Sequence, residues 1–252
     1  MAYFMGAVRS DVLAMDTNLN IILPYDRPAE NQQVPCKVLY LLHGLGDNAA
    51  AWFRYTKAER YAREYGVALV MPEVQRGFYC DMEYGLKYLS YIAQELPELL
   101  EKMFCIGTGR ENSYVAGLSM GGYGALKTAF AFPGQYAGCA SFSGVLDLGY
   151  VLSDHLNNQT ENEFHGLLGP ELVVKPQDDL FLLADNLVKG SLLPKTLITC
   201  GRQDFLYPVN QRYRAHLEKI GLPFRYEEWD GEHEWGFWDV SLKMAMDFFF
   251  KI

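Results

Sequence analysis

A single serine lies among glycines at residues 117–124, in the segment GLSMGGYG. The pattern G-x-S-x-G places a glycine two positions before and two positions after Ser119, as a sharp turn between a strand and a helix requires. Such a turn exposes the serine hydroxyl at the end of the strand and aims the amide of Met120 at the same point. The segment predicts a nucleophilic serine with half of an oxyanion hole. A glycine-rich turn in which Ser119 caps the helix is the alternative.

A serine hydroxyl is too weakly acidic to attack an acyl carbon unaided, so a histidine must take its proton. Four histidines follow Ser119. His216 lies in the amphipathic helical segment NQRYRAHLEKIG, and His155 and His165 lie in a polar region without strand signals. His233 follows the strand-like FRYEEW in the glycine-containing loop WDGEHEW. We therefore predict that His233 is the base.

The histidine needs a carboxylate to fix its tautomer and orientation. Asp204 follows the apolar strand KTLITC in the loop GRQDFLYP, just before a helical segment. Asp147 follows an earlier strand, and Asp230 is too close in sequence to His233 to reach the far nitrogen of its ring comfortably. We predict Asp204 as the acid, with a helix-capping aspartate as the alternative.

The second oxyanion donor is expected from the loop after the strand KVLYLL, which reads LLHGLGDN. Esterases commonly combine the amide after the nucleophile with an amide from such a loop. We predict the backbone N–H of Leu45, with Gly44 as the alternative, and a supporting role for the side chain of His43.

Short apolar segments rich in β-forming residues alternate with helical segments along the chain, which predicts an α/β fold: a mainly parallel sheet with helices on both faces. The expected strands span 20–24, 37–42, 67–72, 113–118, 136–142, 195–200 and 224–229. The expected helices span 49–65, 84–104 with a kink at Pro97, 121–132, 210–221 and 235–252.

One domain over residues 1–252 is the expectation for a chain of this length. Residues 147–190 carry polar residues, Gly and Pro between short helical fragments, so we expect an insertion over the active-site rim of the sheet. The formal net charge of −9 and the absence of a Lys and Arg cluster argue against nucleic acid as a partner.

No apolar stretch approaches the ~18 residues of a membrane span, and no export signal opens the chain. Five scattered cysteines without a CxxC pair indicate a reducing compartment and neither a disulfide framework nor a zinc site. We expect a cytoplasmic protein without metal or cofactor. Cys80 alone is expected to lie outside the core.

Five segments, taken in order, resemble the esterase D branch of the α/β-hydrolases: LLHGLGDN, FYCDMEYG, GLSMGGYGALK, CGRQDFLYPVNQRY and GEHEWGFWD. The chain looks most like bacterial tributyrin esterases, with S-formylglutathione hydrolases and feruloyl or acetylxylan esterases as relatives. The resemblance covers nearly the whole chain and implies the same roles for Ser119, Asp204 and His233 and for the amides of Leu45 and Met120. It also implies that a homo-oligomer is possible.

The expected activity is hydrolysis of short-chain acyl esters, such as tributyrin, acetyl or aryl esters, through an acyl-enzyme. S-formylglutathione hydrolases usually carry histidine where this chain has Leu118, which favours a carboxylesterase over a thioesterase. An acyltransferase with the same triad and a non-catalytic binding module are further alternatives. Trp235, Phe237, Trp238 and Tyr79, together with Phe78, are candidates for contacting the small-molecule ester, with packing in the core as the alternative for the aromatic residues after the base.

Overall fold

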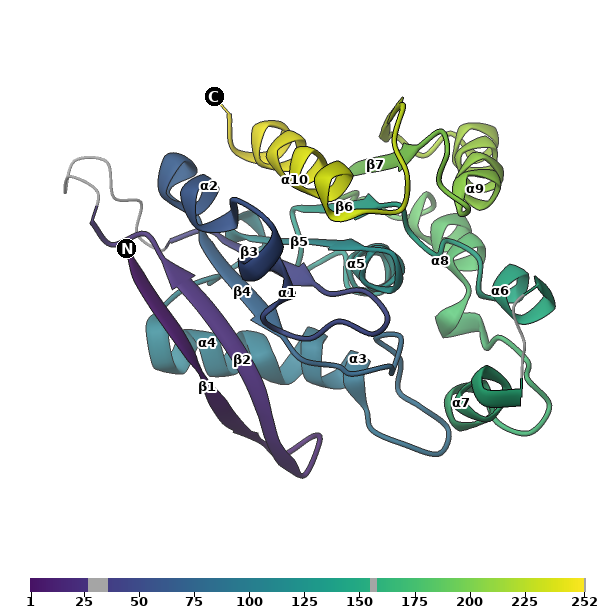
Figure 1. The fold of residues 1–252 in the computed structure, drawn as a ribbon, viewed down its shortest axis with the longest axis horizontal. Coiled ribbons are helices and arrows are strands. Elements are labelled where there is room, and N and C mark those ends of the chain that lie inside the picture. The colour runs from purple at the N-terminus through teal and green to yellow at the C-terminus, as the bar shows by residue number, and fades with distance from the viewer. Residues whose placement is uncertain (27–35, 155–157, 252) are drawn as a thin grey trace.

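The computed structural model describes residues 1–26, 36–154 and 158–251, and its centre is one eight-stranded sheet (Figure 1). The strand order is β1-β2-β4-β3-β5-β6-β7-β8. The strands are β1 (Ala2–Ser10), β2 (Met15–Leu23), β3 (Val38–Leu42), β4 (Ala68–Pro72), β5 (Ser113–Leu118), β6 (Gly138–Phe142), β7 (Lys195–Gly201) and β8 (Arg225–Trp229).

Six of these strands, from β4 to β8 across the sheet, run parallel, whereas β1 and β2 form an antiparallel hairpin at one edge. Parallel neighbours need a crossover, so helices must lie on the faces of the sheet. All the parallel strands therefore end at one common edge, and the loops that follow β3, β5, β7 and β8 meet there.

The two faces of the sheet are buried in two separate cores because side chains alternate along each strand. In β3, Tyr40 and Leu42 point into one core, while Leu39 and Leu41 point into the other. In β5, Val115 belongs to the first core and its neighbours to the second. This two-sided burial explains why the central strands read as continuous apolar runs.

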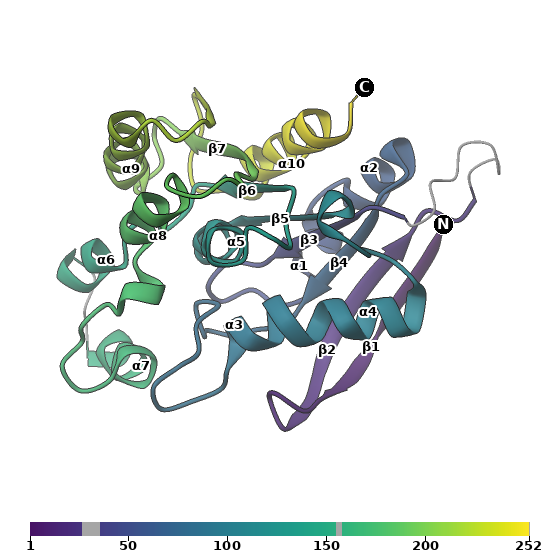
Figure 2. The ribbon, with the colours of Figure 1, turned by 180° about the vertical axis from the view of Figure 1, so that it is seen from behind.

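Helices α1, α2 and α10 cover one face, and the remaining helices cover the other or lie beyond it (Figures 1 and 2). The helical elements are α1 (Ala51–Tyr55), α2 (Ala58–Tyr65), α3 (Tyr88–Ser90), η2 (Tyr91–Glu95), α4 (Leu96–Phe104), η3 (Arg110–Asn112), α5 (Met120–Ala131), α6 (Leu148–Asp154), α7 (Asn158–Leu168), η4 (Pro176–Asp178), α8 (Leu180–Leu187), α9 (Tyr207–Ile220) and α10 (Trp235–Phe250). The α/β fold expected from the sequence is thus confirmed.

The sequence prediction differs from the structure mainly near the N-terminus. It missed β1 and began β2 five residues late, because a half-exposed edge hairpin lacks the apolar run of a buried strand. The helix expected over 49–65 is divided between α1 and α2. The helix expected over 84–104 begins at Tyr88, and its irregularity is a π-helical turn at Tyr91–Glu95, just before Pro97.

The region expected to be an insertion, residues 147–190, holds α6, α7, η4 and α8 and no strand within its described part. It is tied to the loop after β4, since the Glu83 amide donates to the Leu167 carbonyl (3.0 Å) and the rings of Phe78 and Phe164 lie 5.4 Å apart. Its last helix, α8, packs against α5 and α9, so this part of the region also covers a face of the sheet.

A buried ion pair fastens η4 to α5. The Lys127 side chain is completely buried and donates to the Asp178 carboxylate and, at 2.9 Å, to the sulfur of Cys80. Cys80 is itself 1% exposed, so the expectation that it lies outside the core was wrong. Burial raises the pKa of the Cys80 thiol to about 11, which leaves it protonated and unreactive at neutral pH.

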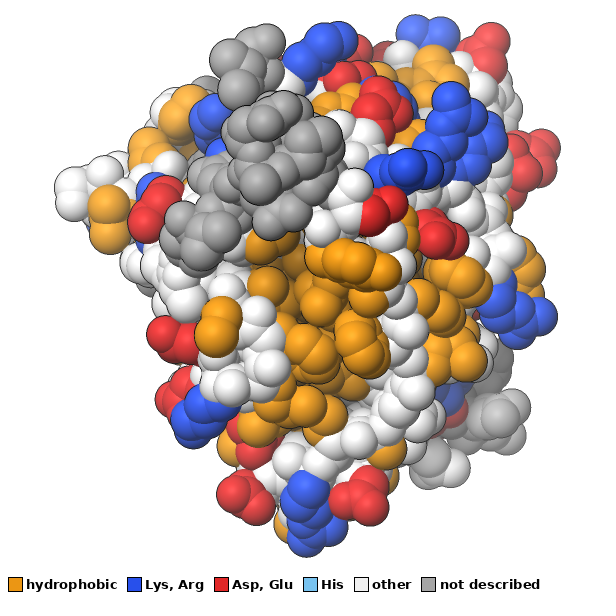
Figure 3. Space-filling view, turned by 90° about the vertical axis from the view of Figure 1, so that its left-hand side faces the viewer, with side chains coloured by type: hydrophobic (Ala, Val, Ile, Leu, Met, Phe, Trp, Pro, Cys, Tyr) orange, Lys and Arg blue, Asp and Glu red, His pale blue; other side chains and the backbone are white. Residues whose placement is uncertain are grey.

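The face that contains the edge strand β1 carries a collection of hydrophobic side chains on its surface (Figure 3). Exposed apolar residues on β1 and α4 include Phe4, Met5 and Met103, and the ring of Phe4 lies 5.5 Å from that of Phe104. No helix within the described residues is both long and apolar enough to cross a lipid bilayer.

We predict that Lys127→Met lowers the free energy of unfolding by about 3–5 kcal/mol, because it leaves the Asp178 carboxylate buried without its cation. Urea denaturation measures the change. The double variant Lys127→Met/Asp178→Leu should recover much of the loss. Lys102→Met, which breaks an exposed pair with Glu98 (3.6 Å), is the control and should change stability by less than about 1 kcal/mol. Equal losses of stability in Lys127→Met and Lys102→Met would contradict a stabilising role for the buried pair of Lys127 and Asp178.

Candidate active site

Ser119 occupies the single residue between β5 and α5, and its backbone is strained. Its φ of 52° and ψ of −117° lie outside the regions that a residue with a side chain usually adopts. Its N–H donates to the Phe142 carbonyl (2.9 Å), and its own carbonyl accepts from Gly122 (3.0 Å) and Val145 (3.1 Å). These bonds to neighbouring segments hold the turn in a conformation that the serine alone would not keep.

The glycines around Ser119 are required by close backbone contacts. A Cβ on Gly117 would lie 2.2 Å from the carbonyl oxygen of Gly121, and a Cβ on Gly121 would lie 2.3 Å from that of Leu42. A Cβ on Gly122 would lie 2.6 Å from the hydroxyl of Ser141. The first two clashes are with main chain, which cannot rotate away. The turn thus brings β5, α5 and the end of β3 together more closely than any other residue type permits.

His233 and Asp204 are joined by a hydrogen bond of 2.9 Å between Nδ1 and Oδ2. Asp204 lies in the loop between β7 and α9, and His233 in the loop between β8 and α10. The Asp204 side chain is fully buried, and its other oxygen accepts the Leu206 amide at 2.8 Å. Burial is the largest influence and raises the pKa of this carboxyl, but the hydrogen bond and charge of His233, the Ser143 hydroxyl and the Leu206 amide together lower it by more, so the net pKa is below the usual value. The carboxylate is therefore ionised at neutral pH.

The imidazole of His233 is held between two aromatic rings. Its centroid lies 4.6 Å from that of Phe205 and 4.8 Å from that of Trp238, which meets it edge-on at 87°. The side chain remains 19% exposed. With Nδ1 bonded to Asp204, Nε2 is the nitrogen left to accept a proton from another group.

The loop after β3 forms a tight turn beside Ser119. The Asp47 amide donates to the Gly44 carbonyl (3.2 Å), and Gly46 has a φ of +87°, which a type II turn requires at that position. Leu45 occupies the other central position, where the turn does not use its N–H. A Cβ on Gly44 would lie 3.6 Å from the Cβ of Ser119, so the turn lies against the serine.

The side chain of His43 forms a hydrogen bond with the first residue of this turn. Its Nε2 accepts from the Val74 amide at 3.1 Å and lies 3.2 Å from a carboxylate oxygen of Glu73, and its Nδ1 lies 2.9 Å from the Gly44 carbonyl. The His43 carbonyl in turn accepts the hydroxyl of Tyr79 (2.9 Å). Tyr79 is completely buried against α5 and presents no surface to a ligand in this structure.

Three of the predicted aromatic contact residues follow the histidine in α10. Trp238 is buried against His233, and Phe237 is buried and stacked on Trp229 at 4.1 Å. Trp235 is half-buried and lies 5.4 Å from Trp52, so it keeps exposed surface. The geometry favours packing for Phe237 and for Tyr79 and leaves Trp235 as the candidate with surface to offer.

Two side chains that the sequence reasoning did not assign to the site also lie in it. Burial raises the pKa of the Asp47 carboxyl, while the nearby His43 and His233 and the Gly44 amide lower it in part. Ser143 is buried with a φ of 47°, and its hydroxyl helps to lower the pKa of Asp204. Both follow strands that end at this edge, which is the signal that could have identified them.

The turn after β3 lies near both Ser119 and His233. Asp47 is close enough to His233 for the two charges to interact, and one oxygen of Asp47 lies 3.0 Å from the Cβ position of Gly44, which faces Ser119. Among the described residues, no hydrogen bond joins Ser119 directly to His233. Such bonds are often long without substrate and shorten in the complex.

The fold carries a strained serine at the end of β5 and, at the same edge of the sheet, a histidine bonded to a buried carboxylate. These features place it among the serine hydrolases with the α/β-hydrolase architecture. The part of the chain that the structure describes contains no group of three or more His, Cys, Asp or Glu that could hold a metal ion.

Comparison with known proteins gives the family. The Esterase family model matches residues 10–249, and the chain belongs to this family of carboxylic ester hydrolases. An acetyl esterase of Caldicellulosiruptor saccharolyticus is 30% identical over an alignment of 256 positions that covers 96% of this chain and 96% of the relative.

Among solved structures, FphF, a fluorophosphonate-binding serine hydrolase of Staphylococcus aureus, matches with a TM-score of 0.91 and 32% identity over 100% of this chain and 99% of its own. The S-formylglutathione hydrolase FrmB of Staphylococcus aureus matches with a TM-score of 0.87 and 32% identity over 99% of both chains.

We predict that Gly121→Ala lowers the free energy of unfolding by about 3 kcal/mol or more and removes esterase activity, because the new methyl group would clash with the Leu42 carbonyl. Thermal unfolding and ester hydrolysis measure the two effects. Gly6→Ala is the matched control, since no described residue other than its two chain neighbours lies within 4 Å of its Cβ position, and its stability should stay within about 1 kcal/mol of the native value. A stable, active Gly121→Ala would refute the tight-turn account.

Proposed function

We propose that this enzyme is a serine carboxylesterase for short-chain acyl esters, with Ser119 as nucleophile, His233 as base and Asp204 as the orienting acid. The observation that carries the proposal is the 2.9 Å bond from His233 Nδ1 to the buried Asp204 carboxylate, at the same sheet edge as the strained Ser119. A buried, ionised carboxylate bonded to a partly exposed imidazole is the arrangement that general base catalysis needs.

In the first step, His233 Nε2 takes the hydroxyl proton of Ser119 as Oγ attacks the ester carbonyl. The carbon becomes tetrahedral and its oxygen takes up negative charge. When the bond to the alcohol oxygen breaks, His233 returns the proton to the leaving alcohol, and the acyl group remains on Ser119.

In the second step, His233 removes a proton from water, the hydroxide oxygen bonds to the acyl carbon, and Ser119 leaves with the proton restored to Oγ. Asp204 stabilises the imidazolium that forms in both steps and keeps Nδ1 protonated in the neutral ring.

The amides of Met120 and Leu45 hold the negative oxygen in both steps. Met120 is the first residue of α5, so its N–H has no partner within the helix and lies at the positive end of the helix dipole. Each such donor contributes about 3 kcal/mol to the transition state. The Gly44 amide, the alternative donor, faces the Asp47 carboxylate and lowers its pKa, which favours Leu45 for the role.

Two observations support a short acyl group. The similar enzyme of Caldicellulosiruptor saccharolyticus is described as an acetyl esterase. In this chain Trp235, two residues after His233, packs against Trp52 and Tyr55, so bulky aromatic side chains lie close to the base in the sequence and restrict a long acyl chain in this proposal.

A thioesterase that acts on S-formylglutathione is the second candidate, because FrmB is described as an S-formylglutathione hydrolase. Leu118 argues against it: the side chain is 1% exposed and lies beneath the turn after β3, 2.5 Å from the Cβ position of Gly44. A buried leucine offers no hydrogen bond where the glutathione enzymes usually have histidine.

We predict that the native enzyme hydrolyses p-nitrophenyl acetate and butyrate faster than the octanoate, and that Ser119→Ala loses activity by at least about 10⁴-fold while remaining folded. The native enzyme should also act on S-formylglutathione more slowly than on the acetyl ester, and product analysis with added alcohols separates hydrolysis from acyl transfer. Near-native activity in Ser119→Ala would reject the nucleophile, and preference for octanoate would reject the short acyl site.

We predict that Asp204→Asn lowers kcat by about 10³–10⁴-fold, because the amide can donate to Nδ1 and select the wrong tautomer of His233. The measurement is kcat for p-nitrophenyl acetate with circular dichroism as a check on folding. Asp230→Asn is the control, since Asp230 is 81% exposed and its one ion pair among the described residues is with Arg202. Near-native kcat in Asp204→Asn, or equal losses in both variants, would show that another group orients the base.

A further inference from the structure

A carboxylate lies beside the proposed nucleophile and has no cation as its partner. One oxygen of Asp47 lies 3.0 Å from the Cβ position of Gly44, and that position lies 3.6 Å from the Cβ of Ser119. None of the ion pairs among the described residues joins Asp47 to a lysine or an arginine. An ester bound at Ser119 therefore meets an unpaired negative charge.

The Asp47 carboxylate is accessible to a ligand, although part of its hydration is lost. The side chain is only partly buried. Burial is the largest influence on its pKa and raises it above the usual value, although His43, the Gly44 amide and His233 lower it in part. A carboxylate with reduced hydration and no cation gains more from a positively charged group than from a neutral hydroxyl.

The position of Asp47 relative to the base indicates which part of the ester it meets. In the proposed mechanism His233 returns a proton to the leaving alcohol, so the alcohol portion lies next to the imidazole. Asp47 is close enough to His233 for their charges to interact. The carboxylate therefore lies on the side of the alcohol portion and not at the far end of the acyl chain.

The ring of Phe205 is a second feature beside the base that suits a cation. Its centroid lies 4.6 Å from that of His233, and the side chain is 57% exposed. The face of an aromatic ring carries partial negative charge and attracts ammonium groups, including quaternary ones. Phe205 thus adds apolar surface for the methyl groups of such a cation.

We propose that Asp47 sets the charge preference of the enzyme and favours esters whose alcohol portion carries a quaternary ammonium group. The inference rests on the proposed function and specifies the alcohol portion of its substrate. Hydrolysis gives the carboxylic acid and the free cationic alcohol. The ammonium group takes no part in the bonds that form and break at the acyl carbon.

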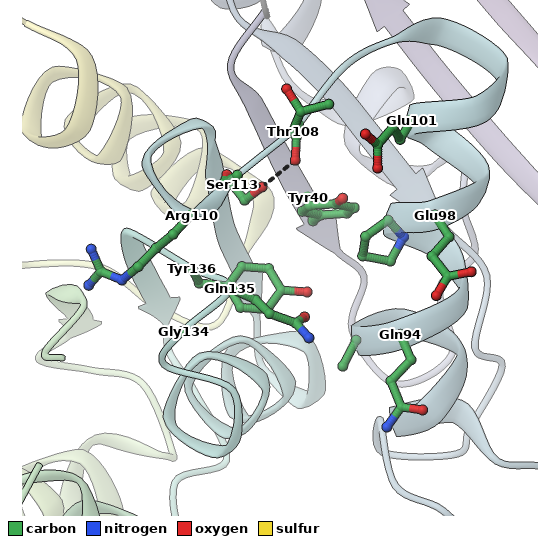
Figure 4. A pocket seen from close by; sticks show the side chains of 14 residues that line it. Tyr40, Gln94, Glu98, Glu101, Thr108, Arg110, Ser113, Gly134, Gln135 and Tyr136 are labelled. Atoms are coloured by element: carbon green, nitrogen blue, oxygen red, sulfur yellow. Dashed lines mark hydrogen bonds between the residues drawn. The ribbon is translucent and has the colours of Figure 1, made fainter.

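A cationic ester has another place to bind, remote from the serine. A cavity of about 400 Å³ at the opposite edge of the sheet is lined by Glu98 and Glu101 of α4, and the guanidinium of Arg110 points away from it (Figure 4). Because β5 begins at this cavity and ends at Ser119, the length of the strand separates the two places. Binding there brings no ester to the nucleophile, so Glu101 provides a control.

Hydrolysis of acetylcholine and of 3,3-dimethylbutyl acetate tests the proposal on the full chain. The two esters have nearly the same shape and only the first is charged, so the ratio of their kcat/KM values isolates the effect of charge. The native enzyme should favour acetylcholine by about tenfold. Asp47→Asn, which keeps the shape of the side chain, should bring the ratio close to one. A loss of activity common to both esters cancels in the ratio.

Two control variants each remove another negative charge. Asp230→Asn removes an 81% exposed carboxylate from the loop after β8, and Glu101→Gln removes one from the cavity at the opposite edge. Both should keep the native ratio because neither charge lies beside Ser119. Circular dichroism checks that all the variants fold. Saturation-transfer NMR of the two unreacted esters with Ser119→Ala measures the preference in binding without catalysis.

Four results would overturn the proposal. The first is equal kcat/KM for the two esters in the native enzyme, and the second is a native ratio in Asp47→Asn. The third is faster hydrolysis of 2-hydroxyethyl acetate than of acetylcholine, which would show that the carboxylate accepts a neutral hydroxyl. The fourth is equal binding of both esters to Ser119→Ala. This last result decides the charge preference even if the native enzyme hydrolyses p-nitrophenyl acetate no faster than Ser119→Ala, which would reject the proposed function instead.

Discussion

The close approach of β3, β5 and α5 at Ser119 is the constraint on which the active edge depends. Gly117 and Gly121 meet with no room for a Cβ, and Gly121 also lies against the Leu42 carbonyl at the end of β3. This contact forces Ser119 into its strained conformation and brings the turn that begins at Gly44 beside it. The strained conformation persists because the surrounding backbone hydrogen bonds stabilise the turn.

The remaining parts of the site are brought to this point by topology. The loops after β7 and β8 hold Asp204 and His233, and parallel pairing carries both to the edge where β5 ends. The pKa of the Asp204 carboxyl is lowered although burial raises it, because His233, the Ser143 hydroxyl and the Leu206 amide together outweigh the effect of burial. An ionised carboxylate inside the protein is stable only because these donors replace its hydration.

The two edges of the sheet carry different chemistry. At the carboxyl edge, polar groups are paired with one another, as in the bond between Asp204 and His233. At the amino edge, Tyr40 and Tyr136 have no protein partner among the described residues. Between them, the buried pair of Lys127 and Asp178 fixes the segment before α8 to the helix that begins beside Ser119. The packing of residues 147–190 is therefore coupled to the active-site helix.

The sequence by itself determined the strand-turn-helix at Ser119, the alternation of strands and helices, and the position of Asp204 and His233 in loops after strands. These features depend on local spacing, on glycine and on the apolar runs of doubly buried strands, all of which are visible in the chain. The sequence predicted only part of the edge hairpin, because a half-exposed strand such as β1 has no continuous apolar run.

Only the tertiary structure decided which side chains meet. Four contacts join residues that are far apart in the sequence. Cys80 is buried against Lys127, Tyr79 is buried with its hydroxyl bonded to the His43 carbonyl, Asp47 lies close to His233, and the ring of Tyr40 packs against that of Tyr136. Such contacts depend on the order of strands in the sheet and on the packing of helices over it, and local sequence patterns carry no information about either.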